Sequence, residues 1–167
     1  LKVVGAFHGL SRARSDARRY PAIDPLDSWS QYPSVAPQAA LAEARRLLRK
    51  GSEVNQMMKV VGEEGVTMDE FVAYLKAEYL DATYLQQDAY HEVDAATGAD
   101  RQRHVFGVLH RVLQAPLSFD THDAARAFFH KLTQAAKDWN RQPADSPAFA
   151  SGQAAIEAMI QETVPHA

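Results

Sequence analysis

Residues 120–139 read DTHDAARAFFHKLTQAAKDW, and this stretch shows most plainly which fold class the chain adopts. Its apolar residues recur every three or four positions, which is the spacing of the core-facing side of an amphipathic helix. These residues are Ala125, Phe128, Phe129, Leu132, Ala135, Ala136 and Trp139. The polar run from Asp120 to Asp123 suits the N-terminal cap of such a helix. The stretch therefore predicts a helix with one buried face.

The same periodicity recurs before it. Pro37 suits a first helical position, and the residues that follow repeat at helical spacing as Ala40, Leu41, Ala44, Leu47 and Leu48. The spacing continues through Val54, Met57, Met58 and Val61, and we assign the pair Met57 and Met58 to core packing and not to a cofactor site. Gly51 is expected to stop or kink this helix, and Gly62 is expected to end it.

Three further helices are predicted. Thr67 and Glu70 have the spacing of a capping box, and the helix they open carries Phe71, Leu75, Tyr79 and Ala82 on one face. A helix that begins near Asp100 carries Val105, Phe106, Leu109, Val112 and Leu113, and Pro116 ends it. The last helix carries Ala155, Ile156, Met159 and Ile160. Together these patterns predict an all-α bundle of about six helices.

The first residues do not follow this pattern. Leu1 to Phe7 read as a short β-strand, and a lone strand cannot satisfy its backbone hydrogen bonds. We therefore expect the chain to be a fragment whose first residues belong to a sheet elsewhere. Pro21 and Pro25 impose an irregular path on the segment that follows. The expected division is residues 1–33, the remnant of another domain, and residues 34–167, the helical bundle.

Composition limits the classes of partner. Hydrophobic residues make up 46% of the 167 residues and charged residues 23%, with a net charge of −3. Nucleic acids and anionic membranes need a concentrated basic face, so neither is expected as a main partner. There is no cysteine and no apolar run long enough to span a membrane, so we expect no direct membrane insertion. No signal peptide is recognisable, and a cytoplasmic location is expected.

A search for catalytic motifs identifies none. No Gly-rich phosphate loop of the Walker type is present. The pair His91–Glu92 has Ala95 where a zinc-protease helix would have its second histidine, and His104 and His110 do not share a helical face well. Asp88, Glu92 and Asp94 are close enough for an acid/base pair, although hydrogen bonding at a helix end is favoured. We assign no catalytic residue and no metal ligand.

Two motifs carry a family resemblance. Residues 85–94, LQQDAYHEVD, follow the helix that begins at Thr67, and residues 20–28 read YPAIDPLDS. Both segments resemble the catalytic A subunit of V-type (vacuolar or archaeal-type) rotary ATPases, and the second is shared with F-type enzymes. The resemblance covers residues 1 to about 115 and identifies the helices as that subunit's C-terminal domain, with residues 1–33 from the edge of its nucleotide-binding domain.

The resemblance implies a function and a site. In that family, three A and three B subunits form a ring around a central shaft, and movement of the helical domains couples ATP hydrolysis or synthesis to rotation and to proton or sodium transport. Tyr20 would stack on adenine, and Tyr90 with Ala89 would form another wall of the pocket. ATP or ADP with Mg²⁺ would bind the intact subunit, but no nucleotide is expected on this chain alone, which lacks the phosphate loop and should be inactive. The head of the enzyme would lie at the cytoplasmic side, peripheral to the membrane.

Two alternatives stay open. The chain could be an independent helical interaction module that binds no nucleotide, and a phosphate loop encoded upstream of Leu1 would exclude this. At the level of single residues, Tyr20 could anchor its loop to the core, and Tyr90 could be an ordinary core or edge residue at a helix end.

Overall fold

The computed structural model describes residues 37–85 and 98–164, and this part of the chain is built from helices alone. Its five α-helices are α3 (Gln38–Val61), α4 (Met68–Leu80), α6 (Ala99–Gln114), α7 (His122–Asn140) and α8 (Pro147–Thr163). A 3-10 turn, η2 (Glu63–Gly65), precedes α4, and a π-helical turn, η3 (Asp81–Leu85), follows it. The predicted all-α class is confirmed. The strand predicted at residues 1–7 and the boundary expected near residue 33 lie outside the described residues.

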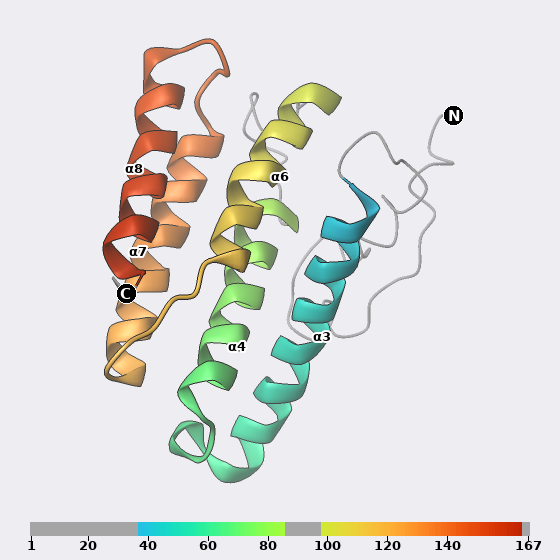
Figure 1. Ribbon diagram of the computed structural model, residues 1–167, viewed down its shortest axis with the longest axis vertical. Coiled ribbons are helices and arrows are strands. Elements are labelled where there is room, and N and C mark those ends of the chain that lie inside the picture. The colour runs from blue at the N-terminus through green and yellow to red at the C-terminus, as the bar shows by residue number, and fades with distance from the viewer. Residues whose placement is uncertain (1–36, 86–97, 165–167) are drawn as a thin grey trace.

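Two helical hairpins make up the structure (Figure 1). α3 and α4 form one hairpin, α7 and α8 form the other, and α4 packs against α7 between them. α6 lies against α3 and α4. The core where these helices meet is aromatic and aliphatic, and its largest fully buried side chains are Trp139, Tyr79, Phe71, Phe106, Leu80, Leu109, Leu132 and Ile156. Most of the predicted apolar stripes therefore face one shared core.

Gly51 lies inside α3, which continues to Val61, so the expectation that Gly51 stops the helix is wrong. A Cβ atom built on Gly51 would lie 2.4 Å from the Cβ of Ala77 on α4. The missing side chain therefore allows the two helices to approach closely. Glycine costs about 1 kcal/mol of helix propensity relative to alanine, and packing against α4 outweighs that cost.

The last turns of α3 also differ from the prediction. Val54 is buried and Met58 packs against the core, but Met57 and Val61 are exposed. Successive residues of a helix point about 100° apart, so only one side of these turns can face α4. Met57 and Val61 lie on other sides, so the assignment of Met57 to the core is wrong.

The predicted helix boundaries are largely confirmed. The Thr67 hydroxyl accepts a hydrogen bond from the Glu70 amide at 3.3 Å, and the Glu70 carboxylate accepts one from the Thr67 amide at 2.9 Å, which completes the capping box. Thr121 caps α7 inside the predicted run, and α6 ends before Pro116. Gly62 ends α3 with a φ of 81°, a left-handed conformation that favours glycine. Pro37 is the N-cap of α3 and not its first helical residue.

Polar contacts join α6 to the first hairpin. The Lys76 ammonium of α4 donates to the carbonyl oxygens of Leu113 and Ala115, at 2.9 and 2.7 Å, where α6 ends. This places a cation at the negative end of the helix dipole. Desolvation lowers the pKa of Lys76, and the nearby charge of Glu43 partly opposes that effect. Glu43 itself lies 2.8 Å from Nε2 of His110, so α3, α4 and α6 are tied together by adjacent polar groups.

Candidate functional site

The three residues expected to contact adenine, Tyr20, Ala89 and Tyr90, lie outside the residues that the structure describes. The described part of the chain leads directly into the segment that contains Ala89 and Tyr90, because η3 follows α4 and ends at Leu85. The geometry of η3 therefore determines how the chain enters that segment.

η3 is anchored in the core by polar residues. Asp81 and Thr83 are buried, and the Thr83 hydroxyl donates to the carbonyl oxygen of Tyr79 at 2.7 Å. Ala82, predicted to continue the buried face, is only half-buried, because the wider π turn departs from the α-helical period. Such turns are frequent at functional sites. A π turn with two buried polar residues, Asp81 and Thr83, thus precedes the motif that carries the expected adenine contacts.

The opposite end of the same hairpin carries an exposed apolar surface. Val60 is 84% exposed, Val61 54% and Met57 36%, and we call these three residues the tip surface. They lie where α3 ends and the chain turns back into α4, at the lower end of the hairpin in Figure 1. Among the described residues they are the large hydrophobic side chains classed as exposed. The three side chains lie three and four residues apart on the helix, so together they form a candidate contact surface for another molecule.

The loop behind the tip surface has a defined shape. Gly62 takes its left-handed conformation directly after Val61. A Cβ built on Gly65 would lie 2.5 Å from Cγ2 of Val61, so the bare backbone of Gly65 packs against that valine. Val66 is buried and fastens the end of the loop to the core. The conformation of the loop next to the tip surface is therefore fixed by Gly62, Gly65 and Val66.

Residues 37–85 and 98–164 contain neither a metal-binding cluster nor a membrane-spanning helix. No group of three or more histidine and carboxylate side chains there is arranged to hold a metal ion. Within the same ranges, no helix combines the length and the apolar character needed to cross a membrane. The tip surface and the η3 end of α4 lie at opposite ends of the first hairpin.

Sequence reasoning missed the tip surface, although a signal was present. Met57 and Met58 are adjacent, as are Val60 and Val61, so these four apolar residues span more of the helix circumference than one buried stripe needs. The exposed side of α3 is charged along its earlier turns, at Arg46, Arg49 and Glu53. The change from charged to apolar residues on that side marks the tip surface.

Comparison with known proteins identifies the hairpin. A family model described as the C-terminal domain of V and A type ATP synthase matches residues 38–123. The chain is 53% identical over 161 residues to the V-type ATP synthase alpha chain 1 of Treponema pallidum, which covers 96% of this chain and 27% of that protein. It is 52% identical over 162 residues to the alpha chain of Treponema denticola, covering 97% and 28%. The alpha chain of Borrelia duttonii is 52% identical over 149 residues, covering 89% and 26%.

The chain thus spans about a quarter of the length of the curated relatives that it matches. The matched segment of the family model contains both helices of the first hairpin, all of α6 and the start of α7. It includes the tip surface, η3 and the segment in which Ala89 and Tyr90 lie. This chain belongs to the family of C-terminal domains of V and A type ATP synthases.

Proposed function

We propose that the chain is the C-terminal helical part of the catalytic alpha (A) chain of a V-type ATP synthase, and that it transmits movement between a nucleotide site and a rotating partner. The observation that carries the proposal is the α3–α4 hairpin in a chain of this family. One end of it presents the exposed Val60 and Val61, and the other continues into the motif with Ala89 and Tyr90. The partners would be B subunits and the central shaft, and the transported ion a proton or sodium.

The construction of the hairpin suits transmission of movement. α3 is continuous over Gln38–Val61 and crosses α4 closely at Gly51, and α4 in turn packs on α7. Close-packed helices move as units because side chains in a packed core cannot deform gradually. A displacement at the η3 end is therefore expected to reach the tip surface at the other end.

The nucleotide role that we propose is limited to the base. Tyr20 would stack on adenine, with Tyr90 and Ala89 beside it. The chain contains no phosphate-binding loop, so the phosphates and Mg²⁺ of ATP or ADP are assigned to other parts of the alpha chain. In the assembled enzyme this part would lie in the peripheral head, on the cytoplasmic side.

A substitution at the tip surface tests the transmission. Val60→Asp in the assembled complex places a charge at a position whose side chain is 84% exposed. The free energy of unfolding should therefore change by no more than about 0.5 kcal/mol. ATP hydrolysis should continue while the amount of ion transported per ATP falls. Ala154→Asp, at an exposed position of α8, is the matched control. If Val60→Asp transports as many ions per ATP as the control does, the tip surface is not the contact that transmits rotation.

A further inference from the structure

We propose that Arg126 of α7 is a positioning residue for the tip surface, because it ties the loop that directly follows this surface to the second hairpin. The inference deepens the proposed function by naming the residue that fixes the orientation of the hairpin tip. It rests on that function only for the statement that the tip surface meets a partner.

Several contacts converge on the Arg126 guanidinium. Nη2 forms an ion pair with the Glu63 carboxylate of η2, in the loop of residues 62–66 that follows the tip surface and that we call the tip loop. Nη1 pairs with Asp123 at 3.3 Å, one turn earlier in α7. The guanidinium carbon lies 5.5 Å from the ring centroid of Phe71 in α4, within the range of a cation–π interaction. One side chain of α7 thus contacts both the loop before α4 and the first turns of α4 itself.

Phe71 gives this arrangement a fixed base. Its side chain is fully buried, and the His122 ring packs against it with centroids 4.5 Å apart. His122 and Arg126 are one turn apart on α7, so both reach the same aromatic ring. The buried Phe71 ring therefore helps to hold the guanidinium in the orientation in which it pairs with Glu63.

The tip loop needs such a contact. It contains two glycines, Gly62 and Gly65, which leave its backbone more freedom than other residues would. Val66 and the Thr67 cap fix its end, whereas Glu63 is the residue that connects its beginning to another helix. A lone surface ion pair contributes little to the free energy of unfolding. The side chains of Arg126 and Glu63 are 50% and 34% exposed, so their ion pair alone would also contribute little. The ring beneath Arg126 and the second carboxylate reduce the freedom that the guanidinium loses on pairing.

Hydrogen–deuterium exchange in the intact, assembled alpha chain tests the proposal. Arg126→Gln should raise the exchange rate of the amides at residues 63–66 by about 3- to 10-fold, since the loop loses its ion pair with α7. Glu63→Gln should give a similar local rise. The double variant should exchange no faster than the faster single variant, because both substitutions remove one interaction. Arg126→Lys keeps the charge and should restore at least part of the protection.

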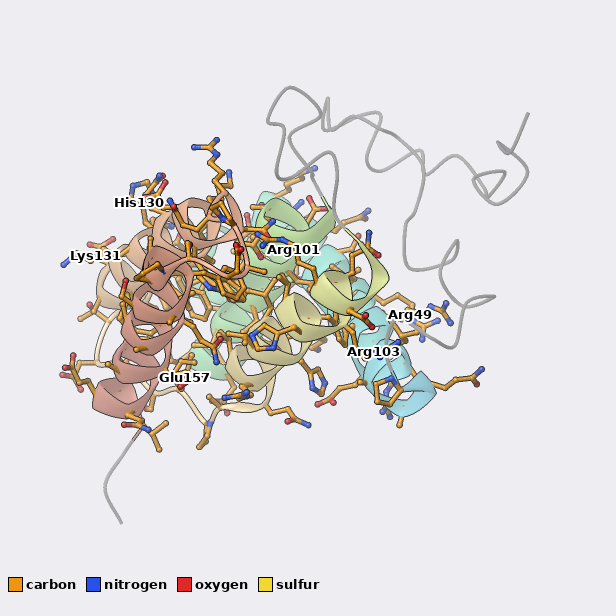
Figure 2. The ribbon with its side chains drawn as sticks, turned by 90° about the horizontal axis from the view of Figure 1, so that it is seen from above. Arg49, Arg101, Arg103, His130, Lys131 and Glu157 are labelled. Atoms are coloured by element: carbon orange, nitrogen blue, oxygen red, sulfur yellow. The ribbon has the colours of Figure 1, made fainter. Side chains whose placement is uncertain are left out.

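Lys131→Gln is the matched control, because this substitution also removes one positive charge from α7. The Lys131 side chain is exposed and points away from the bundle (Figure 2). It should leave exchange at residues 63–66 unchanged. Unchanged exchange in Arg126→Gln would overturn the proposal. So would a rise of equal size throughout α7 and α8, because Arg126 would then stabilise the bundle in general and not the tip. The ion-to-ATP ratio of Val60→Asp tests the proposed function independently, so the two can fail separately.

Discussion

At the scale of single residues, the crossing of α3 and α4 depends on Gly51 having no side chain. Gly51→Ala would force its new methyl group against Ala77, and we expect it to destabilise the chain by about 1–3 kcal/mol, as overpacked cores do. The combination with Ala77→Gly should cost less than the sum of the two single changes. Chemical denaturation measures all three variants.

Gly107→Ala is the control for this experiment. Gly107 lies on the exposed side of α6, and a Cβ built there meets nothing within 4 Å. The same substitution should therefore stabilise the chain, by about 0.5–1 kcal/mol. Destabilisation of similar size at both positions would contradict the close crossing.

Lys76 gives a prediction that depends on pH. Lys76→Met removes two hydrogen bonds to the end of α6 and should cost about 1–2 kcal/mol near neutral pH. Because burial lowers the pKa of Lys76 in the folded chain, the unfolded chain binds more protons between that pKa and about 10.5. The free energy of unfolding of the wild type should therefore rise relative to Lys76→Met as pH increases through this window. Urea denaturation of both chains at pH 7 and pH 10 measures the difference, and a cost that shrinks at pH 10 would contradict it.

The adenine contacts are tested at Tyr20 and Tyr90. Loss of one stacked ring should cost about 1–3 kcal/mol of base binding, or about 5- to 150-fold in nucleotide affinity. Tyr20→Ala and Tyr90→Ala in the assembled complex should therefore raise KM for ATP while kcat changes less. Tyr20→Phe and Tyr90→Phe keep the ring and should bind normally. An alanine variant that keeps the wild-type KM but loses thermal stability would show that its tyrosine is a core anchor.

At the scale of elements, the capping box determines where α4 begins. Thr67→Ala should cost about 1 kcal/mol, since the Glu70 amide loses its acceptor. Hydrogen bonds from the backbone and side chain of Thr67 lower the pKa of Glu70, so their stabilising effect is present above about pH 4.5 and is lost as pH falls through the folded pKa. The variant should consequently lose less stability on acidification than the wild type.

Thr121→Ala at the start of α7 is the matched control. Thr121 accepts a hydrogen bond from the amide of Ala124, and this position has no carboxylate to return one. It should cost a similar free energy, without the acid-dependent part. Thermal unfolding between pH 3 and pH 7 separates the two caps.

The same elements show how far sequence can predict this fold. Thr67 and Glu70, the stripe from Ala125 to Trp139 and the stop at Gly62 act locally, so their spacing was sufficient to place three helix boundaries. The predicted helix stop at Gly51 is wrong because helix propensity describes an isolated helix. The reason for a glycine at this position is its close contact with Ala77, which lies 26 residues later in the chain. The exposure of Val60 could not be read from periodicity, which does not show on which side a neighbouring helix lies. The assignment of Tyr20 and Tyr90 to an adenine site stays a prediction, and it rests on motif resemblance and not on any physical property of the residues.

At the scale of the whole molecule, the helical part should have no chemistry of its own. Phosphoryl transfer needs groups that position the phosphates and neutralise their charge, and this chain has no phosphate-binding loop. The purified 167-residue chain should therefore show no Mg²⁺-dependent ATP hydrolysis above a buffer blank. Hydrolysis that persists through purification and scales with the concentration of the chain would contradict the division of labour proposed above.

The π turn at Asp81–Leu85 has a consequence for sequence length. A π turn holds one residue more than the α-helical turn that it replaces. Loss of any one residue there would let α4 run on as a regular helix. The turn that remains would hold the α-helical number of residues, so the helix would keep its direction and lose only the wide turn that contains the buried Asp81 and Thr83. Deletion of one residue in this turn should consequently destabilise the chain less than deletion of one residue in the middle of α4, where every later side chain would be rotated by about 100°.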